Sequence, residues 1–310
     1  DAVYTGTLPA TVNIANTSVH WSGQHWAMIM LPLPKDKSDR INLITHELFH
    51  RAQRYLKLNP RNYDNNHLDK KEGRIYLRLE LEALRKAVNS DNKSDIDNHL
   101  ANALTFRKAR YSTYPGADTL ENLLELNEGL CEFTGVMMSG RNESEMRAHF
   151  SRHIDAFLLN QTFIRSFPYE TTPIYGYLLS SRKPGWNRDI TLQTNLTNMF
   201  AKSFNLHIEN NAIGRALEIQ NGYNGEVIIN EEAQREEKIN ALLQEYRVKF
   251  IEHPHFVLLF ENMNISFDYT NIMPLDDKGV VYPSIRVKDN WGILEVKNGG
   301  LMSPDWKKIT

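Results

Sequence analysis

The chain has 310 residues, of which 41% are hydrophobic and 24% charged, and this composition is typical of a globular protein with a sizeable core. A formal net charge of -2 gives no electrostatic reason to expect nucleic acid or an anionic membrane surface as a partner. No apolar run approaches the ~18 residues of a membrane span, and the one cysteine, Cys131, excludes an internal disulfide framework.

The N-terminal part of the chain predicts little regular structure before residue 26. The chain begins at Asp1 rather than Met, so we expect that a segment was removed, and a cleaved export signal would fit a periplasmic or secreted protein. Residues 1–25 are polar and predict an irregular segment, whereas residues 26–33 predict a β-strand. This strand is either buried or presents an edge on which a peptide substrate can pair through its main chain.

A predicted helix at about residues 40–56 carries the sequence His46-Glu47-Leu48-Phe49-His50. Its apolar residues recur at helical spacing, and neither Pro nor Gly interrupts it. Two histidines four residues apart lie on one face, so both imidazoles can bind a single metal ion. Glu47 points toward the same place and can act as the general base that activates water. A chance match is expected in only about a few per cent of such chains, so we predict a zinc site here.

The middle of the chain is predicted to be mainly helical and the last part to be rich in strands. Amphipathic patterns predict helices at residues 70–88, 95–111, 118–138, 143–159, 190–220 and 230–250. A second pair, His149 and His153, lacks a glutamate after its first histidine, and we interpret it as surface or core histidines. Residues 167–179 form an aromatic cluster. Short runs between turn residues predict strands at residues 257–260, 265–267, 280–282, 285–287 and 292–296.

Catalytic zinc commonly takes three protein ligands, so a third must follow the two histidines. Glu128 is the best candidate, and Glu132 lies on the same helix face, where it can accept a ring N–H from a ligating histidine. Two carboxylates on an otherwise apolar helix repel each other unless a metal and its ligands compensate them. The alternative is that both line a solvated stripe. Competing donors lie on the preceding helix: Glu80, Glu82 and, with a weaker case, Glu72.

These residues resemble the gluzincin metallopeptidases, in which His-Glu-x-x-His is followed by a second helix bearing Asn-Glu. Residues 127–133 are similar to the aminopeptidase-type Asn-Glu-Gly-Phe-Ala-Glu-Tyr. The resemblance implies a Zn²⁺ ion bound by His46, His50 and Glu128, with Glu47 as the base.

The resemblance extends to Pro168-Tyr169-Glu170, which is similar to the Pro-Tyr-Glu segment of the same enzymes. It implies that Tyr169 stabilises the oxyanion of the tetrahedral intermediate, with Tyr175 as the alternative. Two features depart from the family. The interval between His50 and Glu128 is far longer and holds two predicted helices, and residues 21–26 lack the glutamate that anchors a substrate's amino terminus in aminopeptidases. The resemblance therefore supports the chemistry and leaves the substrate open.

We expect an α+β fold: a mainly helical, zincin-like catalytic domain at residues 1–250 with a strand before the metal helix, and a β-rich region at residues 251–310 packed on it. The expected function is a zinc-dependent metallopeptidase that cleaves a peptide or protein substrate. Two alternatives stay open, a non-catalytic binding or scaffold protein with the same fold and a hydrolase of a non-peptide bond. Three residues of the inserted segment either line the cleft or form structural ion pairs: Asp69, Arg74 and Arg78.

Overall fold

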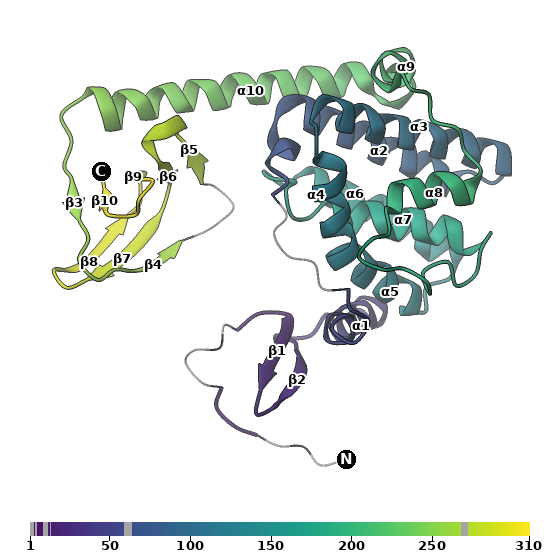
Figure 1. Ribbon diagram of the computed structural model, residues 1–310, viewed down its shortest axis with the longest axis horizontal. Helices are drawn as coiled ribbons and strands as arrows, with labels where there is room; N and C mark the ends of the chain where they lie inside the picture. The colour runs from purple at the N-terminus through teal and green to yellow at the C-terminus, as the bar shows by residue number, and fades with distance from the viewer. Residues whose placement is uncertain (1–2, 4, 9–11, 13, 59–63, 268–271) are drawn as a thin grey trace. The chain divides into compact units, whose positions relative to one another are not determined.

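The protein has an α+β fold in which helices predominate and short strands gather near the C-terminus, as expected (Figure 1). The structure is a computed structural model that describes residues 3, 5–8, 12, 14–58, 64–267 and 272–310. It divides into two compact units, residues 1–228 and 229–310. None of the helices within these described ranges combines the length and the apolar character needed to cross a bilayer.

The division between the units falls inside one long helix, α10 (Gly225–Arg247), and not at residue 250 where we expected it. The helix carries charged residues along its whole length. The presence of charged residues therefore does not mark the boundary between the two units.

The first unit begins with a hairpin that the sequence analysis missed in part. Strands β1 (Thr17–Trp21) and β2 (Gln24–Met28) pair antiparallel, with His20 opposite His25. Ser22 and Gly23 both have positive φ, 52° and 76°, which is the conformation of a two-residue hairpin turn. The expectation of an irregular segment up to residue 25 is therefore wrong for β1, and the expected strand at 26–33 ends at Met28.

Helix α1 (Lys37–Gln53) follows the hairpin and carries the His-Glu-x-x-His sequence. It begins where Asp36 accepts a hydrogen bond from the backbone N–H of Asp39, at 2.9 Å, which satisfies one donor of the first turn. The helix packs mainly against α5 (Leu130–Met138). The two approach closely at Gly135, where a Cβ atom would lie only 2.6 Å from Asn42 Oδ1.

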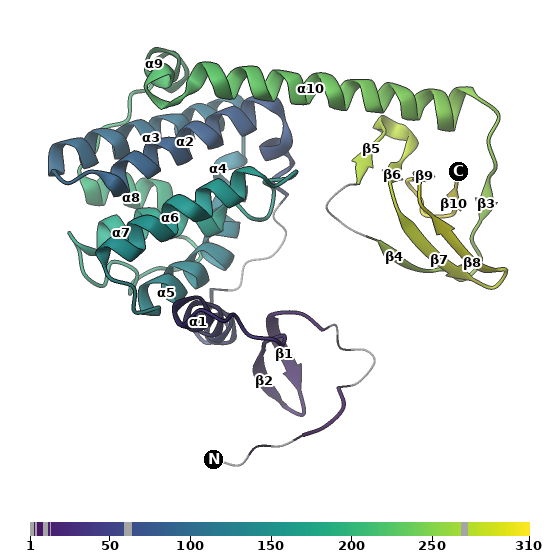
Figure 2. The same ribbon diagram turned by 180° about the vertical axis from the view of Figure 1, so that it is seen from behind.

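The remaining helices of the first unit lie where the apolar patterns predicted them, with two exceptions described below. In addition, the single helix expected over residues 190–220 is two helices, at Leu196–Phe204 and Ala212–Ile219, separated by non-helical residues 205–211. Figures 1 and 2 show α2 and α3 side by side and α1 next to α5. In chain order these helices are η1 (Asn66–Asp69), α2 (Lys71–Asn89), α3 (Lys93–Thr113), α4 (Ala117–Leu124), η2 (Glu125–Gly129), α5, α6 (Glu143–Leu158), α7 (Pro168–Ser180), α8 (Leu196–Phe204), α9 (Ala212–Ile219) and η3 (Gln220–Tyr223).

The two exceptions are both near the predicted metal site. The helix expected over residues 118–138 is interrupted by η2, a single π turn in which the N–H of Leu130 bonds to the carbonyl of Glu125. The aromatic cluster at residues 167–179 is a helix, α7, which begins with Pro168 at its first turn, a favoured place for proline. Helix α7 packs on α5 and on the π turn.

The second unit consists of most of α10, a π turn η4 (Val248–Glu252) and two small antiparallel sheets. One sheet has the order β3-β10-β9-β6-β5 and the other β4-β7-β8. Strand β7 shows the alternation of a half-buried strand, with Ile285 and Val287 in the core. The strands are β3 (Leu258–Leu259), β4 (Asn264–Phe267), β5 (Met273–Pro274), β6 (Val280–Tyr282), β7 (Ile285–Asp289), β8 (Gly292–Val296), β9 (Gly300–Met302) and β10 (Lys308–Ile309). Strands β5, β9 and β10 were not predicted.

Candidate metal centre

The two histidines of α1 lie on one face of the helix, as their spacing predicts. His46 and Glu47 are each 4% exposed, and His50 is partly buried. The Nε2 atoms of the two histidines are 3.0 Å apart, and their rings meet edge to face. Both imidazoles therefore point their outer nitrogen at the same place.

Glu128, on the π turn, brings a third ligand atom to this place. Its Oε2 lies 3.2 Å from His50 Nε2 and 3.6 Å from His46 Nε2. A tetrahedral zinc ion with ligands about 2.0–2.1 Å away would set neighbouring ligand atoms about 3.3 Å apart. The three observed separations bracket this value, so the two nitrogens and the oxygen fit three corners of a zinc tetrahedron.

The Nδ1 atoms of both rings have hydrogen-bond acceptors, which determines which nitrogen of a neutral ring carries the proton. His46 Nδ1 donates to Glu132 Oε2 at 2.8 Å, and His50 Nδ1 donates to Gln53 Oε1 at 2.9 Å. A neutral imidazole carries one N–H, so the proton on Nδ1 leaves a lone pair on Nε2. When both rings are neutral, two lone pairs and a carboxylate oxygen face one another, and a cation would satisfy all three at once. Two imidazoles and a carboxylate form one of the donor sets known for catalytic zinc.

Cys131 belongs to a second possible ligand set. Ligand atoms of His46, His50 and Cys131 lie within 4.8 Å of one another. The sulfur, however, lies 3.3 Å from His50 Nδ1, the inner ring nitrogen, and contacts the carbonyl of Asn127 at 3.0 Å. Burial raises the pKa of the thiol, which disfavours the thiolate that binds metal. We therefore favour Glu128 as the third ligand.

The electrostatics of the centre follow from burial and from close carboxylates. Burial alone would lower the pKa of His46, but hydrogen bonds to Glu128 and Glu132 outweigh it and raise this pKa to about 9. Burial opposes the ionised form of Glu128, yet its bonds to both histidines and to Tyr169 hold its pKa well below the usual range. Burial raises the pKa of Glu47, whose Oε2 is buried and has no hydrogen-bond partner among the described residues.

Tyr169 lies at the centre but contacts the predicted third ligand. Its hydroxyl donates to Glu128 Oε2 at 2.7 Å, and its ring stacks on His46 with centroids 5.4 Å apart. Burial is the main reason that its pKa is raised, so the hydroxyl keeps its proton and remains a donor. The role expected for it, stabilising an oxyanion, stays a prediction.

The π turn that carries Glu128 is held by buried contacts from two other helices, α3 and α7. Arg107 of α3 donates to both oxygens of Glu125, at 3.0 and 2.8 Å, and to Glu80 of α2 at 2.6 Å. Thr171 of α7 also donates to Glu125, at 2.7 Å. At the other end of the turn a Cβ atom on Gly129 would lie 2.3 Å from the Thr172 hydroxyl, which excludes any side chain there.

Several residues considered from the sequence lie elsewhere. Glu80 is paired with Arg107, and the hydroxyl of Tyr175 donates to Glu80 at 3.0 Å, so neither reaches the centre. Glu82 pairs with Arg85 at 3.2 Å. The sequence left two roles open for three further residues, lining the cleft or forming structural ion pairs. None of them is among the residues that line the cleft: Asp69, Arg74 and Arg78. Of these, Arg74 pairs with Asp69 at 3.5 Å and covers the ring of Phe163.

The second histidine pair is a core feature. His149 is 2% exposed, and its ring lies 3.9 Å from that of His153, measured between centroids. Burial first, then His153 and two arginines, lower the pKa of His149 to about 3. The pair is therefore neutral at ordinary pH, and the core interpretation of His149 is confirmed.

Sequence reasoning missed two residues that orient the ligands. Asn42 donates to Glu132 Oε1 at 2.7 Å. Gln53, besides accepting from His50, donates to the carbonyls of Leu126 and Asn127 at 3.2 and 2.6 Å, and so links α1 to the π turn. Asn42 precedes His46 by four residues and Gln53 follows His50 by three, which is the spacing of neighbours on one helix face. That spacing was the available signal.

The centre opens into a cleft of about 390 Å³ between α1, the hairpin, the π turn and α7. Among the described residues, every side chain that lines it is polar or charged, apart from the ring of Tyr169. The start of β1 contributes Thr17 and Ser18, and β2 contributes His25. An elongated substrate that runs past the metal centre would therefore contact the hairpin.

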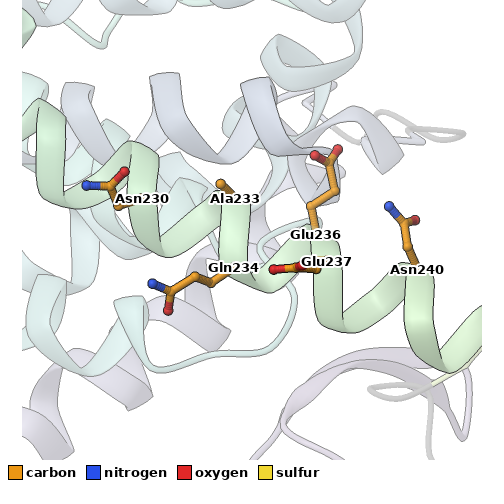
Figure 3. Close-up of a pocket in the computed structure, with 6 residues that line it drawn as sticks. All are labelled: Asn230, Ala233, Gln234, Glu236, Glu237 and Asn240. Carbon is orange, nitrogen blue, oxygen red and sulfur yellow. The ribbon is translucent and has the colours of Figure 1, made fainter.

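A second hollow lies along α10 and is lined by that helix alone, through Asn230, Ala233, Gln234, Glu236, Glu237 and Asn240. Figure 3 shows these side chains spread along the helix instead of converging on one point. We assign no site to it.

Comparisons with known proteins identify no relative: no family model matches the chain, and no curated protein or solved structure matches it. The functional argument therefore rests on the geometry of the centre itself.

Proposed function

We propose that this protein is a zinc-dependent hydrolase of the gluzincin type, and specifically a metallopeptidase. The observation that carries the proposal is the convergence of His46 Nε2, His50 Nε2 and Glu128 Oε2 at separations of 3.0, 3.2 and 3.6 Å. Glu47 lines the same cleft, and its Oε2 atom is buried without a hydrogen-bond partner among the described residues. A scaffold protein would have no need for this buried, unpaired base, so the catalytic reading is favoured.

The residues present fit a zinc ion, since their donor atoms are two imidazole nitrogens and one carboxylate oxygen, and zinc would displace the ring proton that the raised pKa of His46 retains. Zinc bound there would lower the pKa of its bound water to about 7. It would also polarise the carbonyl group that the water attacks.

The chain's own groups would complete the reaction. Glu47, whose pKa is raised by burial, takes a proton from the attacking water and passes it to the leaving amine as the peptide bond breaks. The hydroxyl of Tyr169 is placed to donate either to Glu128, as observed, or to the developing oxyanion. Within the described residues β1 pairs only with β2, so its other edge keeps backbone groups on which an extended peptide can pair.

The test combines metal content with hydrolysis. Wild-type protein should bind one zinc ion per chain by elemental analysis, and Glu128→Ala should lose it, whereas Glu82→Ala should retain it as a matched control on a neighbouring helix. Glu47→Gln should keep its zinc and lose peptide hydrolysis in a library assay. Absence of zinc from the wild type after reconstitution would refute the proposal. Zinc with hydrolysis of esters only would replace the peptidase by a non-peptide hydrolase.

A further inference from the structure

One side of the cleft is basic. Arg51 and Arg54 of the α1 C-terminal end and His25 of β2 line it together, and we call these three residues the basic wall. The acids that line the same cleft, Glu47 and Glu128, are those of the candidate metal centre. The positive charge of the wall thus faces space into which a substrate would extend.

The basic wall continues the helix face that presents the metal ligands. Arg51 lies one turn beyond Glu47, and Arg54 lies one turn beyond His50, so both side chains follow the centre along α1. Arg51 Nε donates to the carbonyl of His25 at 2.7 Å, which ties the guanidinium to β2. Its remaining N–H donors stay available in the planar fork that matches a carboxylate.

Among the residues that the structure describes, no acidic side chain neutralises the charge of the wall. Within the ranges that the structure describes, no carboxylate lies within the 4.0 Å ion-pair distance of Arg51 or Arg54. By contrast, the buried Arg107 and Arg110 of the same unit each form ion pairs with two glutamates. The Nε2 atom of His25 is buried and has no hydrogen-bond partner among the described residues. Burial first, and then Arg54, His20 and Arg51, lower the pKa of this histidine, so the positive charge of the wall comes from the two arginines.

The other residues that line the cleft offer no alternative basis for selecting one peptide over another. None of the described residues that line the cleft is aliphatic, so they provide no apolar pocket for a large hydrophobic residue of a substrate. Hydroxyl and amide groups of Thr17, Ser18 and Gln53 complete it. Charge is therefore the feature by which this cleft can discriminate between peptides.

We propose that the basic wall binds a carboxylate carried by the substrate next to the bond that is cleaved, either an acidic side chain or a free C-terminus. The inference deepens the proposed function and rests on it for the position of that bond. The carboxylate would accept hydrogen bonds from Arg51 and Arg54, and a substrate with an amide in its place would leave the guanidinium charge unmatched.

The test reads binding in a chain that cannot turn over. Full-length Glu47→Gln protein, loaded with zinc, is titrated with acetylated, amidated alanine-rich peptides that carry one glutamate at successive positions, and with the same peptides carrying glutamine. A third arm uses the glutamine peptides with a free C-terminal carboxylate, which separates the two sources of charge. At one position at least, the carboxylate peptide should bind about tenfold more tightly than its amide partner, and high salt should reduce the difference.

Substitutions then locate the preference. Arg51→Gln and Arg54→Gln should each reduce it, and the double variant should abolish it. Arg188→Gln, an exposed position outside the cleft lining with the same change in net charge, should leave it unchanged. Equal binding of acid and amide peptides at every position overturns the inference, as does a preference that survives in the double variant, or the failure of every peptide to bind.

The two proposals fail separately. If the wild-type protein cleaves peptides irrespective of their charge, the proposed function stands and this inference is refuted. If the zinc-loaded protein binds acidic peptides through Arg51 and Arg54 but hydrolyses none of them, only the proposed function is refuted.

Discussion

Glu132 offers a way to test whether the orientation of His46 depends on a hydrogen bond or on a charge. One of its oxygens accepts from His46 Nδ1 at 2.8 Å and the other from Asn42 Nδ2 at 2.7 Å. In Glu132→Gln the amide oxygen can keep the bond to His46, and the amide N–H₂ then faces Asn42. The Oδ1 atom of Asn42 is buried without a partner, so rotation of its amide group by half a turn would supply the missing acceptor. The glutamine variant thus removes the charge and retains the geometry.

The magnitude follows from what such partners contribute to metal sites. Groups that orient a ligating histidine typically change metal affinity about 10–100-fold, which corresponds to about 1.4–2.7 kcal/mol. Glu132→Gln should fall near the lower end, about tenfold, because only the charge is lost. Glu132→Ala leaves both His46 Nδ1 and Asn42 Nδ2 without their acceptor and should fall near the upper end, about a hundredfold.

The assay is competition for zinc with a chromogenic chelator at constant pH, with unfolding by denaturant measured in parallel on the metal-free proteins. Glu143→Gln is the control, since this exposed carboxylate pairs with Arg147 away from the centre. If Glu132→Ala binds zinc as tightly as the wild type, His46 does not ligate through Nε2 and the geometric argument for the centre is refuted.

Three further predictions probe neighbouring groups. Tyr169→Phe should lower kcat about 10²–10³-fold with unchanged zinc affinity if its hydroxyl stabilises the oxyanion; a loss of zinc affinity alone would instead assign it to holding Glu128. Cys131→Ser should retain zinc by elemental analysis, and its loss would make the sulfur a ligand. The pKa of His149 is about 3 in the folded protein and about 6.5 in the unfolded chain, so the unfolded chain binds a proton more readily. The free energy of unfolding should therefore fall as the pH drops from about 6.5 toward 3, by about 2–3 kcal/mol at pH 4.5. Denaturant titrations should show a smaller pH slope for His149→Phe, and an unchanged slope would contradict the assignment.

The sequence was most informative where the chemistry depends on local spacing. His46, Glu47 and His50 lie within one helix, and helical periodicity alone brings them to one face. Glu128 and Glu132 were found by a similar argument, although the π turn between α4 and α5 could not be anticipated. A π turn inserts one residue into the helical repeat, and apolar spacing over so short a stretch does not reveal it.

Elements whose stability depends on tertiary contacts were harder to predict. Helix α7 contains Pro173 and two threonines, which are poor helix formers. It forms nevertheless because its face packs closely: a Cβ atom at Gly176 would lie 2.6 Å from Phe133 and 2.7 Å from Trp186. The hydrogen bond between Asn42 and Glu132 spans 90 residues of sequence. No local pattern encodes such a pairing, which is why the residues that orient the ligands were missed.

The long interval between His50 and Glu128 has a structural consequence that the motif alone does not suggest. Helices α2 and α3, which fill it, contribute Glu80 and Arg107 to a fully buried ionic cluster that ends on Glu125, the first residue of the π turn. Buried ion pairs contribute little net stability compared with apolar packing, but removal of one partner is costly because it leaves an uncompensated charge. Such a cluster therefore tolerates few alternative arrangements of the turn. In this protein the inserted helices hold the turn that bears Glu128 in place through charge, whereas His46 and His50 are placed by the regular geometry of a single helix.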